Sequence, residues 1–261
     1  MRLALLKTET IRGSFKYYSL EDMIKLITTS WDDGHPLDIK IADLLEKYNL
    51  KGTFYIPKTN PQNEVMPEKD IISLSKRFEI GGHTLGHKNL NKCDSQQLVD
   101  EIEGCFDWLK KLTGQVPVSF CPPFGKYNRE SLDVMRHAGF TNIRTTSLLS
   151  PHAKLPVMDT TMQVYNHSRF VYLKHLLIRS KFSNLKLWLK SGSTDNYLRL
   201  AQFYLNHIDT YGGCFHLWGH SWEIELFDLW NQLEDLFKLM ANMAEFEYVE
   251  SRRLPKPNFI I

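Results

Sequence analysis

Along residues 24–146, short apolar runs typical of strands alternate with longer segments in which apolar residues recur at helical spacing. Short runs such as "IKLITTSW" (24–31) and "GTFYIP" (52–57) are rich in β-branched and apolar residues, as buried strands are. Between them, "PLDIKIADLLEKYN" (36–49) and "DSQQLVDEIEGCFDWLKKLTG" (94–114) repeat apolar residues at helical spacing, with Pro36 near one start and Gly114 at one end. Strands that alternate with helices at this short spacing predict a parallel sheet wrapped by helices, and hence a barrel-like α/β domain.

The same pattern places the remaining elements. Helices are predicted over residues 67–78, 128–139 and 224–243, and strands over 79–84, 118–124, 140–146 and 212–220. Two brief strands are expected within 150–165, and a basic helical elaboration over 166–210. Residues 1–22 are predicted to form a loosely ordered arm, which leaves residues 24–251 as the core of one domain spanning residues 1–261.

Composition narrows the classes of function. A net charge of +2 gives no reason to expect a nucleic-acid partner, and 43% hydrophobic residues are enough for a sizeable core. The first ten residues do not resemble a signal peptide, and no apolar run is long enough to span a membrane, so a cytoplasmic location is expected. The basic, apolar segment 166–190 could contact a membrane surface, although a packed helix is the commoner outcome.

Unusual polar residues follow several predicted strands at the point where each strand ends. They are Asp32, Asp33, His83, His87 and His220, together with the "PPF" of residues 122–124. The carboxyl ends of parallel barrel strands share one face, where active sites of such barrels lie. The sequence therefore predicts one site built from four separate strands.

Paired aspartates next to paired histidines suggest a metal ion. His83 and His87 are four residues apart, and one aspartate would complete a set of two histidines and one carboxylate. Adjacent strand side chains point to opposite faces, so both aspartates reach the site only if the chain leaves strand geometry there, which Gly34 permits. The second carboxylate would then be free to accept a proton from water. A strand end followed by an Asp-Gly turn is the simpler alternative.

Four ordered motifs carry a family resemblance. "TTSWDDG", "HTLGH", "FCPPFGKYN" and "HLWGHSWE" resemble those of the polysaccharide deacetylase family, also called the NodB homology domain or carbohydrate esterase family 4. The resemblance covers residues 24–146 and resumes near 213. It implies a distorted (β/α) barrel with about seven parallel strands, and hydrolysis of N-acetyl groups on amino sugars. It also implies one divalent metal ion, expected to be zinc, with cobalt, nickel or iron as alternatives.

The resemblance also implies roles for individual residues. Asp33, His83 and His87 match the metal ligands, and Asp32 matches the general base. The backbone N–H of Phe124 would help to hold the oxyanion, and His220 would protonate the leaving amine, with His216 as the alternative acid. The substrate-binding candidates are Trp218, Trp222 and Pro123, although core packing explains the two tryptophans equally well.

Two family features are missing from the sequence. Cys121 stands where many members carry an arginine that pairs with the base, and we predict that Arg144 replaces it, with a surface role as the alternative. The acidic residue that orients the acid histidine has no clear match, and Asp159 and Glu223 are candidate substitutes. Two other functions therefore stay open. One is a deformylase or amidohydrolase acting on a lipid-linked or nucleotide-linked sugar, and the other is a catalytically weak carbohydrate-binding homologue.

Overall fold

A curled, parallel β-sheet forms the centre of the protein. The computed structural model describes residues 8–11, 14–17, 24–153 and 155–255. The sheet runs β8-β7-β6-β5-β4-β3-β10-β9, β11 pairs with β3, and every pairing is parallel. The strands are β3 (Lys25–Asp32), β4 (Gly52–Ile56), β5 (Glu79–Gly82), β6 (Ser119–Phe120), β7 (Asn142–Arg144), β8 (Val157–Met158), β9 (Met162–Gln163), β10 (Gly213–Gly219) and β11 (Glu247–Tyr248).

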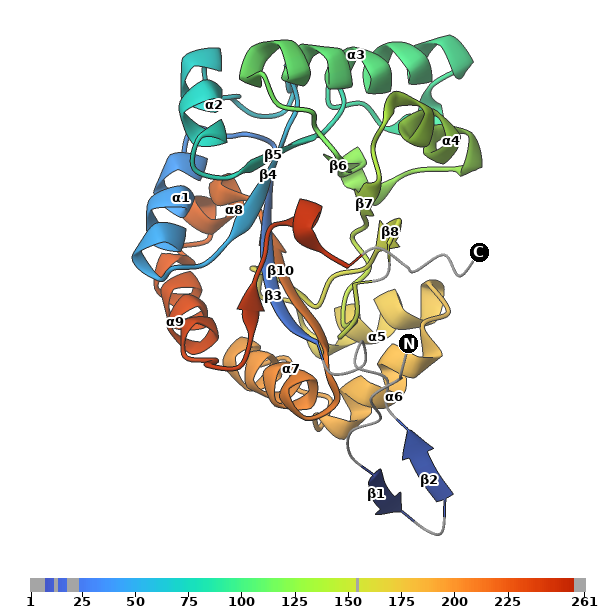
Figure 1. Ribbon diagram of the computed structural model, residues 1–261, viewed down its shortest axis with the longest axis vertical. Coiled ribbons are helices and arrows are strands. Elements are labelled where there is room, and N and C mark those ends of the chain that lie inside the picture. The colour runs from blue at the N-terminus through green and yellow to red at the C-terminus, as the bar shows by residue number, and fades with distance from the viewer. Residues whose placement is uncertain (1–7, 12–13, 18–23, 154, 256–261) are drawn as a thin grey trace, which may run out of the picture.

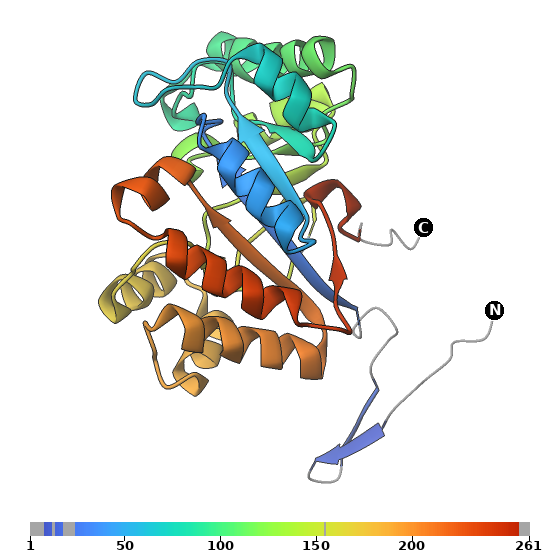
Figure 2. The same cartoon turned by 90° about the vertical axis from the view of Figure 1, so that its left-hand side faces the viewer.

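Helices surround this sheet, as Figures 1 and 2 show. They are α1 (Asp38–Lys47), α2 (Glu68–Ser75), α3 (Ser95–Thr113), α4 (Arg129–Ala138), α5 (Arg169–Ile178), α6 (Phe182–Lys190), α7 (Tyr197–Tyr211), α8 (Ser221–Leu226) and α9 (Trp230–Ala241). Short 3₁₀ turns lie at η2 (Leu90–Lys92), η3 (Pro123–Gly125) and η4 (Ser251–Arg253). The predicted distorted α/β barrel is confirmed. Among the described residues the sheet has nine strands rather than about seven, and four of these are only two residues long, too short to leave a clear pattern in the sequence.

Local sequence signals explain where the helices begin and end. Asp94 and Gln97 form a reciprocal capping box at the start of α3, and Gly114 ends that helix in a left-handed conformation. The single helix predicted over residues 224–243 is wrong, because the structure divides this region into α8 and α9. Asp228 has a φ of 51° between them, a conformation that aspartate tolerates better than most residues do.

The N-terminal segment contains a small hairpin. β1 (Thr8–Ile11) pairs antiparallel with β2 (Ser14–Tyr17). The rest of the predicted arm over residues 1–22 lies outside the described residues, and the loosely ordered arm therefore stays a prediction. The single-domain assignment and the cytoplasmic location also stay predictions. Among the described helices, none combines the length and apolar character needed to cross a bilayer.

The core fixes the strands relative to the helices. Trp31 of β3 packs edge-on against Phe237 of α9, with ring centroids 6.0 Å apart, and both side chains are fully buried. On the other side of the sheet, Phe120 of β6 packs against Phe140 at 4.8 Å beneath α3 and α4. Because both ends of the curled sheet are packed in this way, the loops at the carboxyl ends of the strands rest on a rigid base.

Candidate metal and catalytic site

The end of β3 delivers two carboxylates to one cavity. Asp32 is the last residue of the strand, and Asp33 and Gly34 then adopt φ values of 79° and 63°. This abrupt change turns both side chains into a cavity of about 500 Å³. A Cβ atom on Gly34 would lie 2.6 Å from Cγ2 of Ile56, so only glycine fits the turn. The predicted departure from strand geometry is confirmed.

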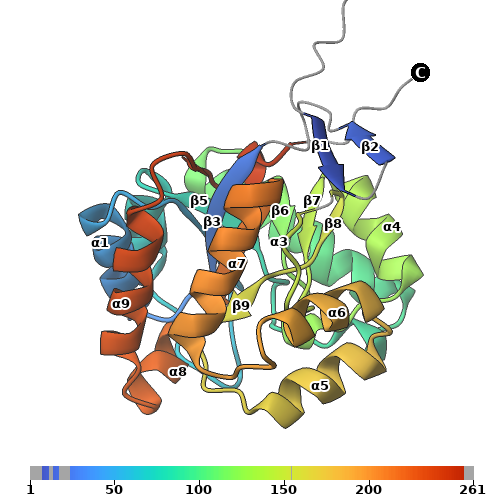
Figure 3. The same cartoon turned by 90° about the horizontal axis from the view of Figure 1, so that it is seen from below.

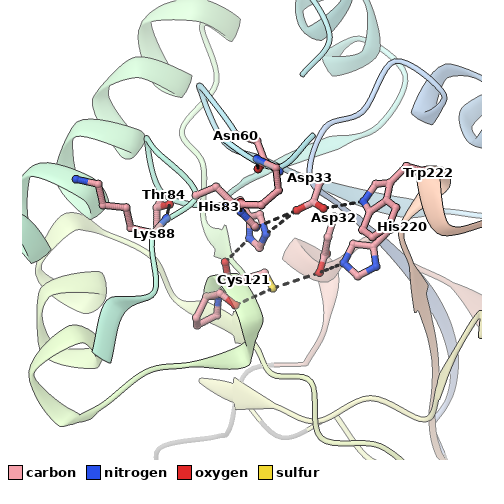
Figure 4. A network of polar contacts seen from close by, with 12 residues as sticks. Asp32, Asp33, Asn60, His83, Thr84, Lys88, Cys121, His220 and Trp222 are labelled. Atoms are coloured by element: carbon pink, nitrogen blue, oxygen red, sulfur yellow. Dashed lines mark hydrogen bonds and ion pairs between the residues drawn. The ribbon is translucent and has the colours of Figure 1, made fainter. Parts of the chain in front are cut away.

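Asp33, His83 and His87 bring one ligand atom each to the same point. Figure 4 shows His83 facing Asp33 in the cavity. Oδ1 of Asp33 lies 3.0 Å from Nε2 of His87 and 3.4 Å from Nε2 of His83. Nδ1 of His83 is 2.6 Å from the Cys121 carbonyl oxygen, and Nδ1 of His87 is 2.9 Å from Oε1 of Gln62. Carbonyl oxygens only accept hydrogen bonds, so both Nδ1 atoms donate, and in neutral rings both Nε2 atoms carry lone pairs.

That arrangement fits a cation. Two nitrogen lone pairs face Asp33 Oδ1, a buried oxygen that accepts no hydrogen bond from the described residues. Donor atoms of this kind repel one another unless positive charge lies between them, and two histidines with one carboxylate are a common set for zinc and related ions. Burial opposes the ionisation of Asp33, but positive charge on His83 and His87 outweighs it and lowers the pKa of that carboxyl group, and a cation held between the three residues would act in the same direction. A second group of Asp32, His83 and Cys121 fits less well, because burial raises the pKa of the Cys121 thiol well above its usual value.

Arg144 reaches the second carboxylate from β7. Its guanidinium donates a hydrogen bond to Oδ1 of Asp32, and its side chain is completely buried. The guanidinium carbon lies 4.6 Å from the ring centre of Trp218 and 5.3 Å from that of Tyr55. The structure thus pairs Asp32 with an arginine although Cys121 follows β6, and the surface alternative for Arg144 is excluded. The Cys121 thiol also points to Asp32, with Sγ 3.6 Å from Oδ2.

His220 stands on the other side of Asp32 with its own carboxylate. Its Nε2 lies 4.0 Å from Asp32 Oδ2, and its Nδ1 lies 2.5 Å from Oε2 of Glu223. Burial lowers the pKa of His220, but the hydrogen bond to Glu223 and the charge of Asp32 outweigh it, raising the pKa to about 9. Glu223 therefore orients His220, whereas Asp159 binds Thr145 and Lys181 instead.

His216 lies deeper along the same strand. Its Nε2 is 2.9 Å from the Ser30 hydroxyl, and its ring is 1% exposed. Burial and the nearby Arg144 lower the pKa of His216 to about 3, so this ring is neutral. Because His216 is buried, neutral and bonded to Ser30, it is a weaker candidate for the proton donor than His220.

The substrate-binding candidates divide into different groups. Trp222 lines the cavity and donates from Nε1 to Oδ2 of Asp33 at 2.8 Å. Trp218 also lines the cavity, but it is only 5% exposed and packs against Arg144. Pro123 is buried in η3, and its neighbour Pro122 lines the cavity instead.

Phe124 lines the same cavity. It has a φ of 59°, its ring lies 4.8 Å from that of His87, and its side chain is 53% exposed. Among hydrogen bonds between described residues, none uses the Phe124 N–H. This donor therefore has no protein acceptor among the described residues, and its role at an oxyanion stays a prediction.

Four residues of the site share an unusual backbone conformation. Asp33, Thr84, His87 and Phe124 have φ values of 79°, 64°, 51° and 59°. Such conformations cost about 1–3 kcal/mol each for residues other than glycine, and they cluster at functional sites. Because all four lie at the carboxyl-terminal edge of the sheet, this edge is the strongest candidate for the functional site of the barrel.

Several cavity residues were not predicted from the sequence. Gln62 holds His87, and Gln163 donates to Glu223 and accepts from His167, which extends the support of His220. Arg179 of the helical elaboration also lines the cavity. Gln62 follows β4 at the same edge as the predicted site, so the topology could have indicated it. The residues from 163 onward follow an irregular stretch that offered no such signal.

Comparison with known proteins agrees with the motifs. Residues 21–143 match the family model described as polysaccharide deacetylase. The resemblance to the polysaccharide deacetylase family is confirmed. One relative is the peptidoglycan-N-acetylmuramic acid deacetylase PdaC of Bacillus subtilis, 30% identical over 114 residues. That match covers 43% of this chain and 24% of PdaC, so the chain spans about a quarter of the length of this relative.

Solved structures of deacetylases and esterases share the fold. The chitin deacetylase of Colletotrichum lindemuthianum matches with a TM-score of 0.55 at 15% identity, over 86% of this chain and 84% of that one. A family 4 acetyl xylan esterase from Clostridium thermocellum, in complex with a cobalt ion, gives 0.53 at 16% identity, over 87% and 88%. At these identities the likeness supports the polysaccharide deacetylase fold alone.

Proposed function

We propose that the protein is a metal-dependent hydrolase that removes an N-acetyl group from an amino sugar. The observation that carries this proposal is the convergence of Asp33, His83 and His87 beside an arginine-paired Asp32 and a carboxylate-paired His220. The family match over residues 21–143 supports it. Asp33, His83 and His87 would hold one divalent ion, expected to be zinc, which would polarise the amide carbonyl as a Lewis acid.

Asp32 acts as the general base. Arg144 and the Cys121 thiol hydrogen-bond its two oxygens, which orients the carboxylate toward the cavity. It accepts a proton from the water that attacks the amide carbon. The tetrahedral oxyanion then accepts a hydrogen bond from the Phe124 N–H, whose position is set by the left-handed turn at η3.

His220 acts as the general acid. Glu223 holds Nδ1, which directs Nε2 toward the side of the cavity where Asp32 lies. The pKa of about 9 keeps the ring protonated at neutral pH, as a proton donor requires. Transfer of that proton to the departing amine nitrogen completes cleavage of the amide bond.

Arg179 favours an anionic form of the substrate. It lines the cavity, and its guanidinium donates to the hydroxyls of Ser147 and Thr146 at 2.8 and 2.9 Å. No carboxylate among the described residues pairs with it. An unpaired guanidinium at a cavity suits a phosphate, so an acylated sugar linked through phosphate to a lipid or a nucleotide is the second candidate.

A catalytically weak homologue is less well supported. That hypothesis depended on the missing partner of the base and the missing partner of the acid. In the structure Arg144 and Glu223 contact Asp32 and His220, so neither group lacks support.

Metal analysis together with turnover tests the proposal. Elemental analysis should find about one metal ion per chain in wild type and in His137→Ala, an exposed control on α4, but little in His83→Ala. Asp32→Asn should retain the metal yet release no acetate from N-acetylated amino-sugar oligomers. Full turnover by Asp32→Asn, or absence of metal after loading with zinc or cobalt, would contradict the assignment.

A further inference from the structure

One helical face of the protein is exposed and apolar. Of thirteen exposed large hydrophobic residues among those described, seven lie between residues 170 and 189: Phe170, Val171, Leu173, Leu177, Ile178, Phe182 and Leu189. The most exposed are Phe170 at 77%, Ile178 at 71% and Phe182 at 62%. A contiguous group of this kind marks an interaction surface rather than ordinary scatter.

The periodicity shows how α5 is oriented. Tyr172 and Leu176 form its buried face, and Phe170, Leu177 and Ile178 point away from the core. These outward positions are seven and eight residues apart, so they form one stripe along the helix. We call the outward side chains of α5 and α6 the α5–α6 face. Figure 3 shows both helices at the edge of the molecule, outside the sheet.

Charge indicates what this face contacts. Residues 160–194 contain no aspartate or glutamate. Within them, the segment "RFVYLKHLLIRSKFSNLKLWLK" (169–190) consists of basic and neutral residues only. Lys174, Lys186 and Lys190 are exposed and have no ion-pair partner among the described residues. A second copy docked face to face would bring these cations together, because a two-fold interface sets a surface against itself. An anionic lipid headgroup layer complements both the charge and the apolar stripe.

The face adjoins the candidate active site. Val171, His175 and Arg179, all at or next to α5, line the catalytic cavity. Exposed Phe124 lies on the same cavity, against His87. A surface that contacts the α5–α6 face therefore also lies near the opening through which substrate enters.

We propose that the α5–α6 face docks on an anionic membrane surface and brings the cavity to the bilayer. α5 lies in the headgroup layer with Phe170, Ile178 and Phe182 in the acyl boundary. Docking itself needs no chemistry from the site. Its consequence for substrate, an acylated sugar anchored in the membrane through a phosphate, rests on the proposed function.

Vesicle sedimentation tests the docking. Wild type should sediment with vesicles of phosphatidylglycerol and phosphatidylcholine at low salt, and much less with phosphatidylcholine alone. The triple variant Phe170→Ser, Ile178→Ser, Phe182→Ser should bind about tenfold more weakly or worse. The matched control Val116→Ser, Tyr211→Ser removes exposed apolar side chains outside the α5–α6 face and should bind as wild type does.

A charge variant keeps the test decisive if the triple variant folds poorly. Lys174→Gln, Lys186→Gln should weaken binding about 25-fold, from about fivefold for each cation near the surface. The proposal would be overturned if wild type bound equally well to vesicles with and without phosphatidylglycerol, or if the triple variant bound as tightly as wild type. A dimer, seen by sedimentation without vesicles, that the triple variant abolishes would also overturn it. Asp32→Asn should dock normally, so loss of turnover and loss of docking are separate outcomes.

Discussion

Replacing Arg144 by methionine would leave the Asp32 carboxylate without its cation. Arg144 is completely buried, and Asp32 is 3% exposed, so water cannot take the place of the guanidinium. Methionine keeps much of the length and the apolar contact with Trp218 while it removes the charge. The variant therefore isolates the electrostatic part of the interaction.

The size of the effect follows from this burial. Removing one partner of a buried ion pair costs about 3–5 kcal/mol, because it leaves an uncompensated charge. Asp32 can reduce that cost by taking up a proton, but a protonated Asp32 cannot accept one from water. Since about 1.4 kcal/mol corresponds to a factor of ten, a loss of about 3–5 kcal/mol in the interactions that hold the base corresponds to about two to three and a half orders of magnitude. We expect Arg144→Met to lose a similar factor in kcat/KM near neutral pH.

Urea denaturation and kcat/KM measured across pH check both parts. Arg136→Met is the matched control, because Arg136 pairs with Asp133 on the surface, and such exposed pairs contribute about 1 kcal/mol or less. The double variant Arg144→Met, Asp32→Asn should regain much of the lost stability, since neither charge remains, but it should stay inactive. If Arg144→Met unfolds as wild type does and keeps full activity, the pair neither stabilises the protein nor orients the base.

Two further predictions concern the acid and the turn. Glu223→Gln removes the charge that raises the pKa of His220 to about 9, so the alkaline fall in kcat/KM should move to lower pH, with at least a tenfold loss of activity. An unchanged alkaline limb would show that His220 is not the acid. Gly34→Ala should lose about 2–4 kcal/mol in urea denaturation, because its Cβ would meet Ile56 at 2.6 Å in a left-handed turn. Gly114→Ala has open space around it and should lose only about 1 kcal/mol, so equal losses would contradict the steric account.

The sequence predicted the secondary-structure elements and the meeting of Asp33, His83 and His87 better than the contacts that support this group. Asp33, His83 and His87 follow strands whose pattern is clear, and parallel topology brings strand ends together. Glu223 was only a candidate because its distance from His220 depends on where α8 begins, directly after β10. Gln62 and Arg179 lie beyond irregular loops or on the helical elaboration, so their approach to the cavity depends on tertiary packing that no local pattern encodes.

The four left-handed residues at the rim bear on how this site can change over evolutionary time. Asparagine or glycine at Asp33, His87 or Phe124 would relax the backbone, but each would discard a side chain that lines the cavity. Together these conformations cost an amount comparable with the net stability of about 5–15 kcal/mol of an ordinary domain. The packed core of the barrel must supply enough stability to offset this cost. In descendants with weaker core packing, selection for stability would therefore favour replacing these left-handed residues. Such proteins would lose the active site before they lose the fold.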